Sequence, residues 1–380
     1  MEARLSIAMI GTRGVPARYG GFETAVEEIG KRLAVSGHDV TVFCRGYDRD
    51  VREYLGMHLV HLPALRYKVA ETLSHTSLSV LHRRARQADV ALVFNAANAP
   101  LLPALRAAGV PIAVHVDGLE WQRSKWSGGG RRYYLVGERL AVRWADALIA
   151  DAIGIKRYYL ERYSVDSVFI PYGAPLITAP TEHRLAELDL APGAYHLVVA
   201  RFEPENHVHL ALDGYVTGEV ERPLVVVGTA PYAGEYIAGL RRKAAQHSGI
   251  RLVGGVWDQE LLDALYAGCV SYVHGHSVGG TNPSLLRSMG AAAPALAYDV
   301  EFNREVLGEC GHFWKDPRQL AGLLEAAERD PSACREMGRK AQERAAKTYT
   351  WDDVASRYER LCLDLHAGRR RHRRISSRHM

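Results

Sequence analysis

The sequence lacks the features of membrane-spanning and secreted proteins. Among its 380 residues no apolar run reaches about 18 residues, so we expect no transmembrane helix. The first residues, Met-Glu-Ala-Arg-Leu-Ser, lead directly into a short apolar run, which argues against a signal peptide. The five cysteines form no close pair, which favours reduced thiols and a cytoplasmic protein: Cys44, Cys269, Cys310, Cys334 and Cys362.

Motifs for metals and dinucleotides are also missing. The chain has no C-x-x-C or H-E-x-x-H motif, and its 17 histidines do not cluster at ligand spacing, so we expect no metal. The absence of a G-x-G-x-x-G fingerprint argues against a nicotinamide oxidoreductase, and no Walker loop is present. Hydrophobic residues make up 47% of the chain, enough to bury a sizeable core.

Positive charge gathers at the C-terminal end. The formal net charge is +5, and arginines crowd the segment from Arg369 to Arg378, for which we expect a disordered tail. Such a tail is either a solubilising appendage or a peripheral contact with the anionic inner membrane. No aromatic residue interleaves these arginines, so we expect no nucleic-acid partner.

Short apolar runs alternate with helical patterns, which predicts two doubly wound α/β domains. Strands are expected at 5–10, 40–43, 90–94, 112–116, 147–150 and 168–170, and again at 197–200, 224–227, 250–253, 270–273 and 295–298. The expected organisation is an N-terminal domain over 1–172, a linker over 173–193, a C-terminal domain over 194–350, a closing helix over 351–366 and a basic tail over 367–380. Because ligands lie beyond the carboxyl ends of such strands, we expect the loops there to face a cleft.

A glycine loop follows the first expected strand and precedes an amphipathic helix. Strand, glycine turn and helix form the arrangement that cradles phosphate in nucleotide-binding folds. A solvated surface loop is the structural alternative. The loop residues that we consider for binding are Arg13, Arg18, Tyr19, Gly20 and Gly21.

A second glycine loop follows the strand expected at 270–273. Gly279 and Gly280 leave its backbone free to bend towards a ligand. Thr281 or Asn282 can cap the following helix, and Pro283 fits its first position. Free N–H groups at such a terminus attract phosphate, although a capped helix without any ligand is the common alternative.

Chemically active side chains follow other strands. His115, Asp117 and Glu120 are candidates for a general base, an orienting group or a stabiliser of positive charge. Trp121 and Trp126 are candidates for a wall on which a sugar stacks.

The strand expected at 197–200 is followed by Arg201, which is the best candidate for a diphosphate clamp because guanidinium binds phosphate bidentately. A surface ion pair with Glu203 or Glu205 is the alternative. Gly228 ends another strand and is expected beside a nucleotide base.

Taken together, these segments resemble the family-4 glycosyltransferases of GT-B fold, and most closely the bacterial rhamnosyltransferase-like branch. The resemblance extends over about residues 5–360. It is carried by GTRGVPARYGGFET (11–24), HVDGLEWQRSKWS (115–127), IPYGA (170–174), ARFEPENHVHL (200–210), HGHSVGGTNPSLL (274–286) and AYDVEFNREVLG (297–308).

The resemblance implies retaining transfer of a sugar from a nucleotide-diphosphate sugar to a hydroxyl acceptor, without a metal or another cofactor. The donor is expected mainly on the C-terminal domain and the acceptor on the N-terminal one. His115 matches the family's histidine near the reacting carbon. The expected donor-binding residues are Gly20, Gly21, Arg201, Asn206, His207, Gly228, Gly280, Thr281, Asn282 and Arg287. The expected acceptor-binding residues are Arg13, Arg18, Tyr19, Asp117 and Glu120.

The chain departs from the family pattern at two places. Asn206 stands where the wider family has a lysine, with His207 beside it as in this branch. Arg287 stands where the family has the glutamate that holds the nucleotide ribose, and Gly279 matches the family's other glutamate. A guanidinium has no acceptor for ribose hydroxyls. Three explanations remain open: a donor that lacks a ribose hydroxyl, as in dTDP; added charge towards a diphosphate or an anionic acceptor; or a degraded site.

We therefore expect transfer of a 6-deoxy, rhamnose-like sugar from a dTDP-sugar, in the synthesis of a cell-surface polysaccharide or an antibiotic. One alternative is transfer of dihydrostreptose from dTDP to streptidine 6-phosphate. Another, from a different class, is a non-catalytic protein that binds nucleotide sugars.

Overall fold

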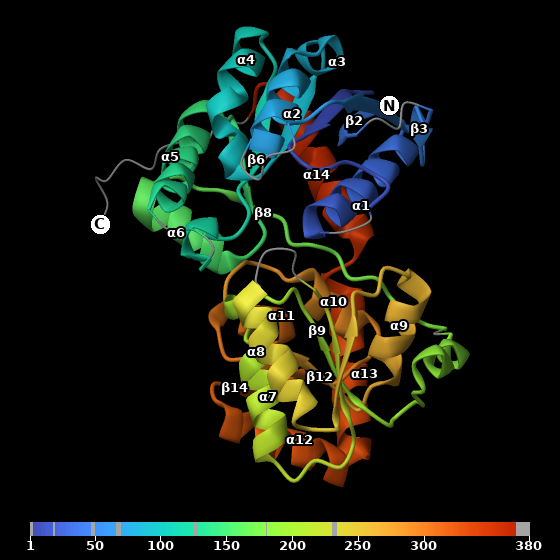
Figure 1. Cartoon of the computed structure of the whole chain (residues 1–380). Coiled ribbons are helices and arrows are strands. Elements are labelled where there is room, and N and C mark those ends of the chain that lie inside the picture. Colours follow the sequence, from blue (N-terminus) through green and yellow to red (C-terminus); the bar gives the residue numbers. More distant parts are fainter. Residues whose placement is uncertain are drawn as a thin grey trace. The chain divides into compact units, whose positions relative to one another are not determined.

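The computed structural model describes residues 3–17, 20–46, 50–65, 70–124, 126, 128–179, 181–229 and 234–369. The chain divides into two compact units. Unit 1 comprises Met1–Gln122, Trp126–Tyr172 and Trp351–Met380, and unit 2 comprises Arg123–Lys125 and Gly173–Thr350. Figure 1 shows that each unit is a sheet covered by helices.

Unit 1 is built on an eight-stranded sheet in the order β3-β4-β2-β1-β5-β6-β7-β8. Its strands are parallel except for the antiparallel pair of β3 and β4. The strands are β1 Ser6–Ile10, β2 Asp39–Arg45, β3 Glu53–Tyr54, β4 Met57–Leu62, β5 Val90–Phe94, β6 Ile112–His115, β7 Ala147–Ala150 and β8 Val168–Phe169. All six strands expected in this part are present. The structure adds β3 and β4, because β4 (MHLVHL) includes half-buried histidines that hide its apolar pattern.

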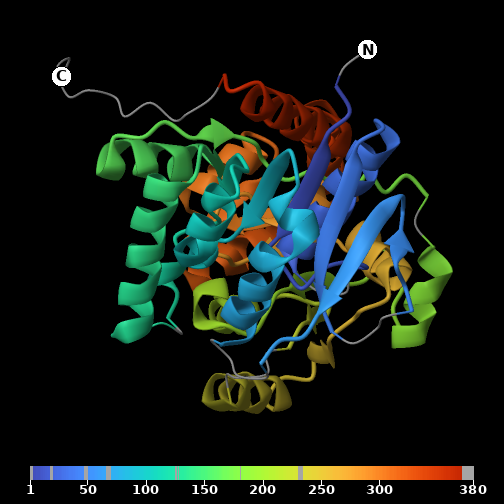
Figure 2. The same cartoon turned by 90° about the horizontal axis from the view of Figure 1, so that it is seen from above.

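The helices of unit 1 include one from the far end of the chain. They are α1 Gly21–Val35, α2 Ala70–Leu81, α3 Arg83–Arg86, α4 Leu102–Ala107, α5 Gly129–Trp144, α6 Ile153–Tyr163 and α14 Trp351–His366. In α14 the apolar face predicted from Val354, Tyr358 and Leu361 is buried. Figure 2 shows α14 (red) along one side of the first sheet, and α14 packs against α1. An ion pair joins these two helices, with Arg32 Nε 2.6 Å from Asp352 Oδ1.

Unit 2 contains a six-stranded parallel sheet in the order β11-β10-β9-β12-β13-β14. Its strands are β9 His196–Val199, β10 Leu224–Val227, β11 Ile250–Gly254, β12 Ser271–His274, β13 Ala295–Tyr298 and β14 His312–Trp314. Its helices are α7 Val208–Thr217, α8 Gly234–Ala245, α9 Gln259–Gly268, α10 Pro283–Gly290, α11 Glu301–Leu307, α12 Pro317–Arg329 and α13 Pro331–Thr348. The five strands expected in this part are present, and β14 is additional.

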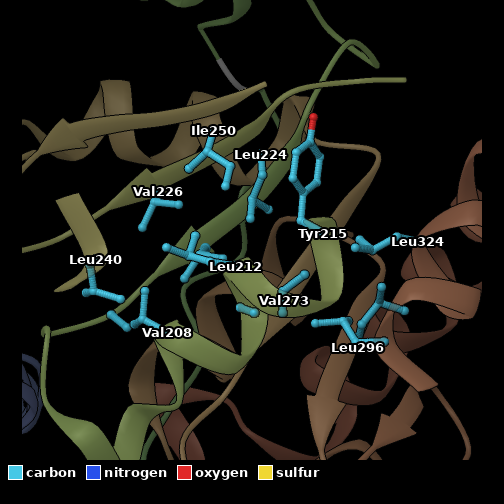
Figure 3. Close-up of a cluster of buried hydrophobic side chains, with 14 of the residues drawn as sticks. Val208, Leu212, Tyr215, Leu224, Val226, Leu240, Ile250, Val273, Leu296 and Leu324 are labelled. Atoms are coloured by element: carbon cyan, nitrogen blue, oxygen red, sulfur yellow. The ribbon is translucent and has the colours of Figure 1, made fainter. Parts of the chain in front are cut away.

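The core of unit 2 lies between α7 and the sheet. Figure 3 shows Val208 and Leu212 of α7 directed towards Val226 of β10, and Tyr215 beside Leu224. All these side chains are at least nine-tenths buried. The segment for which we expected a linker contains a 3₁₀ helix, Glu182–Leu188, that packs on α9 within unit 2.

Both sheets are doubly wound, as predicted. In unit 1 the chain runs outward from β1 to β2 and β4 and then returns to β5 on the other side of β1. In unit 2 it runs from β9 to β10 and β11 and returns to β12 on the other side of β9. Ligands of such sheets bind at these reversals, beyond the carboxyl ends of the strands. The cleft that we expect between the two units depends on their relative placement and stays a prediction.

Candidate functional site

In unit 2 the predicted donor-binding segments meet at the reversal between β9 and β12. Arg201 follows β9, Gly228 follows β10 and the second glycine loop follows β12, and these three strands are neighbours. Gly228 is required by packing, since a Cβ there would lie 1.9 Å from Ala200 O. The three predicted segments are therefore brought to one edge of the sheet.

Arg201 keeps part of its side chain available at this edge. Its side chain is 40% exposed, and its Nη2 lies 3.7 Å from Glu203 Oε2. The ion pair that we considered as the alternative is thus present, but at a distance too long for a strong hydrogen bond. Burial, followed by the nearby His274, Arg201 and Arg123, holds the pKa of His276 well below its usual range. Arg201 therefore lies close to the loop that follows β12.

Asn206 and His207 hold the loops at this edge of the sheet through hydrogen bonds to backbone carbonyl groups. Asn206 is 1% exposed, and its Nδ2 donates to Arg201 O at 2.8 Å. His207 Nδ1 lies 2.9 Å from Gly275 O, where it acts as the donor, and burial lowers the pKa of His207. These contacts differ from our expectation for Asn206, because a buried amide bonded to the backbone holds Arg201 in place and offers little to a ligand. Asn206 is a positioning residue on this geometry.

The second glycine loop forms a capped helix terminus, as its sequence predicts. Asn282 is the cap, and its Oδ1 accepts hydrogen bonds from Ser284 N at 3.0 Å and Ser284 Oγ at 2.8 Å. Pro283 is the first residue of α10. The Tyr272 hydroxyl lies 3.0 Å from Ser284 Oγ and supports the turn from β12. Gly280 and Thr281 precede the cap, so their backbone is the part of the loop nearest the positive end of α10.

Arg287 is engaged within the protein. Its Nη1 forms an ion pair with Asp263 of α9, and its Nη2 donates to Gln259 Oε1 at 2.7 Å. The side chain is 19% exposed. Its charge is therefore largely compensated by α9, which adds a structural reason for the arginine to the three explanations left open by the sequence.

In unit 1 the first glycine loop is held by carboxylates of α1. Glu23 Oε1 accepts from Arg13 N at 3.0 Å, and Glu27 Oε2 accepts from Ala17 N at 2.7 Å. Gly20 precedes α1 with a φ of 112°, a conformation that favours glycine, and Gly21 is the first residue of that helix. The Glu23 carboxylate already occupies part of the phosphate cradle predicted here. Arg18 and Tyr19 lie outside the described residues.

His115 ends β6 inside a cluster of aromatic rings. Its ring centroid lies 5.1 Å from that of Phe22, 5.8 Å from that of Phe94 and 5.6 Å from that of Tyr172. The side chain is buried, and burial lowers the pKa of His115 to about 3. Its Nδ1 accepts from Asp117 N at 3.3 Å, which places the proton of the neutral ring on Nε2. His115 is thus a neutral hydrogen-bond donor and not a general acid or base near neutral pH.

Comparison with known proteins adds to this geometry. A family model described as a domain of unknown function, DUF1972, matches residues 5–175. The O-antigen chain mannosyltransferase B of Escherichia coli is 24% identical over 180 residues, which span 45% of this chain and 46% of that protein. The chain thus spans about half the length of this curated relative.

Two solved structures cover nearly the whole chain. Sucrose-phosphate synthase from Thermosynechococcus elongatus aligns with a TM-score of 0.81 at 21% identity, covering 95% of this chain and 99% of that one. Anabaena Alr3699/HepE in complex with UDP aligns with a TM-score of 0.75 at 15% identity, covering 94% and 99%. The fold is GT-B.

Within this GT-B fold the other acceptor-side residues have partners. Asp117 has a φ of 64°, its Oδ1 accepts from Gly118 N at 2.8 Å, and its Oδ2 lies 3.5 Å from Asn95 Nδ2. Glu120 is 9% exposed, with Oε2 3.5 Å from Trp126 Nε1. The guanidinium of Arg131 lies 5.0 Å from the ring centroid of Trp121. One face of the predicted sugar-stacking wall is therefore covered by an arginine.

Three basic side chains near the carboxyl ends of strands were not among the site residues predicted from the sequence. In unit 2, His276 stacks on His274 with ring centroids 4.4 Å apart. Also in unit 2, Arg123 Nη1 lies 3.5 Å from Glu203 Oε2. In unit 1, Arg45 ends β2 with its side chain 11% exposed. The signal that was available is position, because each of His276 and Arg45 ends or follows a parallel strand.

Neither a metal centre nor a membrane-spanning helix is present among the described residues. No group of three or more His, Cys, Asp and Glu side chains placed to hold a metal ion occurs among them. Within the same residues, no helix has the length and apolar character needed to cross a membrane.

Proposed function

We propose that the protein is a retaining glycosyltransferase that uses a nucleotide-diphosphate sugar. One observation carries the proposal: Arg201 and the loop that leads to the capped N-terminus of α10 follow neighbouring strands, β9 and β12, at the chain reversal of unit 2. A guanidinium and a helix N-terminus both favour phosphate oxygens. The GT-B fold and the similarity to an O-antigen mannosyltransferase support this proposal.

In the proposed reaction, unit 2 binds the donor through Arg201 and the backbone of Gly280 to Asn282. As the bond from the sugar to the diphosphate breaks, negative charge grows on the leaving diphosphate. Fixed positive groups act most strongly on such developing charge, because they need no reorganisation during the reaction. No metal ion is part of this proposal, and activity should therefore survive EDTA.

Unit 1 would bind the hydroxyl acceptor near His115. The neutral ring can donate one hydrogen bond from Nε2 to a sugar hydroxyl near the reacting carbon. Phe22, Phe94 and Tyr172 fix the orientation of the ring by packing around it. His115 would thus position the sugar without changing its own charge.

For the donor we propose a dTDP-linked 6-deoxysugar of the rhamnose type. The supporting observation is Arg287, whose guanidinium is bound by Asp263 and Gln259. Position 287 offers no carboxylate to a ribose hydroxyl, so a nucleotide without the 2′-hydroxyl would lose little there. The bound UDP named for the Anabaena protein makes a uridine donor the competing outcome.

The product is proposed to belong to a cell-surface polysaccharide, in line with the O-antigen relative. Transfer of dihydrostreptose to streptidine 6-phosphate is the second candidate, favoured by the basic residues Arg13 and Arg45 at the strand edge of unit 1.

The proposal is tested by calorimetric titration of the protein with dTDP, UDP, GDP and ADP in EDTA. Arg201→Ala should weaken nucleotide binding by about tenfold or more, because a charge-assisted contact to phosphate is lost. Arg241→Ala is the control, since Arg241 is exposed on α8. Preference for UDP or GDP would reject the dTDP assignment. Absence of binding by any nucleotide would reject the proposed function itself.

A further inference from the structure

Arg45 is a nearly buried cation whose charge and hydrogen-bond donors are only partly satisfied by its neighbours. Its side chain is 11% exposed, and its Nε is buried without a hydrogen-bond partner. Its Nη2 donates to Thr72 Oγ1 at 3.0 Å, and its Nη1 lies 3.6 Å from Glu71 Oε1. Removing a guanidinium from water is costly unless its donors are satisfied. A neutral hydroxyl and a distant carboxylate satisfy them only in part.

The surroundings of Arg45 add positive character. Arg45 N donates to Arg13 O at 2.9 Å, so the two arginines lie on adjoining segments. Burial is the main cause that lowers the pKa of Arg45, and the charge of Arg13 lowers it further while Glu71 and Glu23 oppose this. Of these two carboxylates, Glu23 already accepts the N–H of Arg13. Two like charges are thus kept together at one strand end.

A second buried polar group lies beside Arg45. His75 of α2 is fully buried, and neither of its ring nitrogens makes a hydrogen bond of good geometry, although the backbone of Cys44 is in contact with the ring. Burial lowers the pKa of His75 to about 4, the backbone contact with Cys44 opposes this, and the charge of Arg45 lowers the pKa further. The ring is therefore neutral, and its single N–H is held only by the weak contact with the backbone of Cys44. Thr72 and His75 are one turn apart on α2, and the hydrogen bond from Arg45 to Thr72 places the N-terminal half of this helix at the end of β2.

We infer that Arg45, with Arg13, Thr72 and His75, forms a subsite for an oxyanion carried by the acceptor, such as a phosphate or carboxylate group. Its place at the carboxyl end of β2 puts it on the ligand-binding edge of unit 1, on the opposite side of β1 from β6 and His115. An oxyanion would supply the acceptors that the guanidinium lacks and would separate the charges of the two arginines. This inference rests on the proposed function, because it describes the acceptor of the same reaction.

The test uses inorganic phosphate as the probe and Arg201→Ala protein as the background. That background weakens phosphate binding at the proposed donor site of unit 2, so that binding in unit 1 is more easily measured. We expect the Arg201→Ala protein to bind phosphate in a calorimetric titration, and the added change Arg45→Gln to weaken this binding by about tenfold or more. Arg83→Gln is the matched control, because Arg83 is an exposed arginine of α3 in the same unit.

The outcomes separate the two proposals. Phosphate binding that is equal with and without Arg45→Gln overturns the subsite, as does a complete absence of phosphate binding by the Arg201→Ala protein. Arg45→Gln in the otherwise unchanged protein should leave nucleotide binding as it was, so failure of the donor proposal appears in a different titration. If the Arg45→Gln protein does not fold, the Arg45→Lys protein is used to test the subsite. It keeps the charge but loses the planar fork, and its phosphate binding should be weakened while its unfolding temperature is kept.

Discussion

Replacement of Gly275 by alanine should damage the proposed donor site without touching any ligand. Gly275 follows β12, and a Cβ there would lie 2.3 Å from Asn206 O and 3.3 Å from His207 Cβ. A carbon–oxygen contact needs about 3.3 Å, so one of the two loops must move by about 1 Å. Asn206 holds Arg201 O through its side chain, so the displacement is passed to Arg201.

The expected size follows from this displacement. Overpacking of a rigid site costs about 1–3 kcal/mol of unfolding free energy. We also expect the nucleotide dissociation constant to rise by about tenfold, which corresponds to about 1.4 kcal/mol. The first value is measured by urea unfolding and the second by calorimetric titration with the nucleotide that the unchanged protein binds best.

A matched glycine provides the control. Gly322 is exposed in α12, and a Cβ there would meet no atom within 4 Å. Gly322→Ala should therefore stabilise the protein by about 0.5–1 kcal/mol and leave nucleotide binding unchanged. If Gly275→Ala behaves like Gly322→Ala in both measurements, the two loops do not constrain each other and the positioning role of Asn206 is refuted.

Three further outcomes are expected. Burial alone would raise the pKa of Glu328, but hydrogen bonds from His196 and from two backbone N–H groups lower it to about 2. The ionised carboxylate should contribute about 2 kcal/mol to the free energy of unfolding, fully above pH 4.5 and less as the pH falls towards 2. Glu328→Gln should therefore narrow the difference between the unfolding free energies measured in urea at pH 6 and at pH 3. An unchanged difference would contradict this assignment. Because burial lowers the pKa of His115 to about 3, His115 should cause no titration step near pH 6.5 in the dependence of turnover on pH. A step near pH 6.5 that is present in the unchanged protein and absent from His115→Ala would mean that the ring is charged during the reaction. Ellman's reagent should modify only Cys310 and Cys334 in the native protein, since the other three thiols are buried; a third fast-reacting thiol would count against the packing described.

Much of the fold was predictable because the periodicity of apolar residues is a local signal. The strands of both sheets and the face of α14 follow directly from that pattern. The exceptions are short or polar: β4 carries two histidines, and β14 has only three residues. The doubly wound α/β class followed from the order of these elements, whereas the GT-B expectation came from the resemblance of the motifs at the strand ends to a known family.

The site was less predictable because its contacts join residues distant in sequence. The capping role of Asn282 follows from neighbouring residues, and the structure agrees with it. The partners of Arg287 on α9 lie more than twenty positions earlier, so no local pattern indicates that its charge is compensated. Asn206 and Arg45 are similar cases, because the burial that defines their roles arises only when separate loops pack together.

The position of α14 has a consequence for synthesis of the chain on the ribosome. Unit 1 contains both β1 and α14, so the surface of α1 on which α14 packs cannot be covered until residues 351–366 have emerged from the ribosome. Unit 2 lies between these two parts in the sequence and is available to fold first. A protein shortened to the segment matched by the family model would expose the surface of α1 on which α14 packs. It would also lose the partner of His38, whose Nε2 lies 2.9 Å from Glu359 Oε1. Nascent chains of this protein therefore carry an incomplete unit 1 until α14 has been synthesised, and a chaperone that shields apolar surface should bind them during that interval.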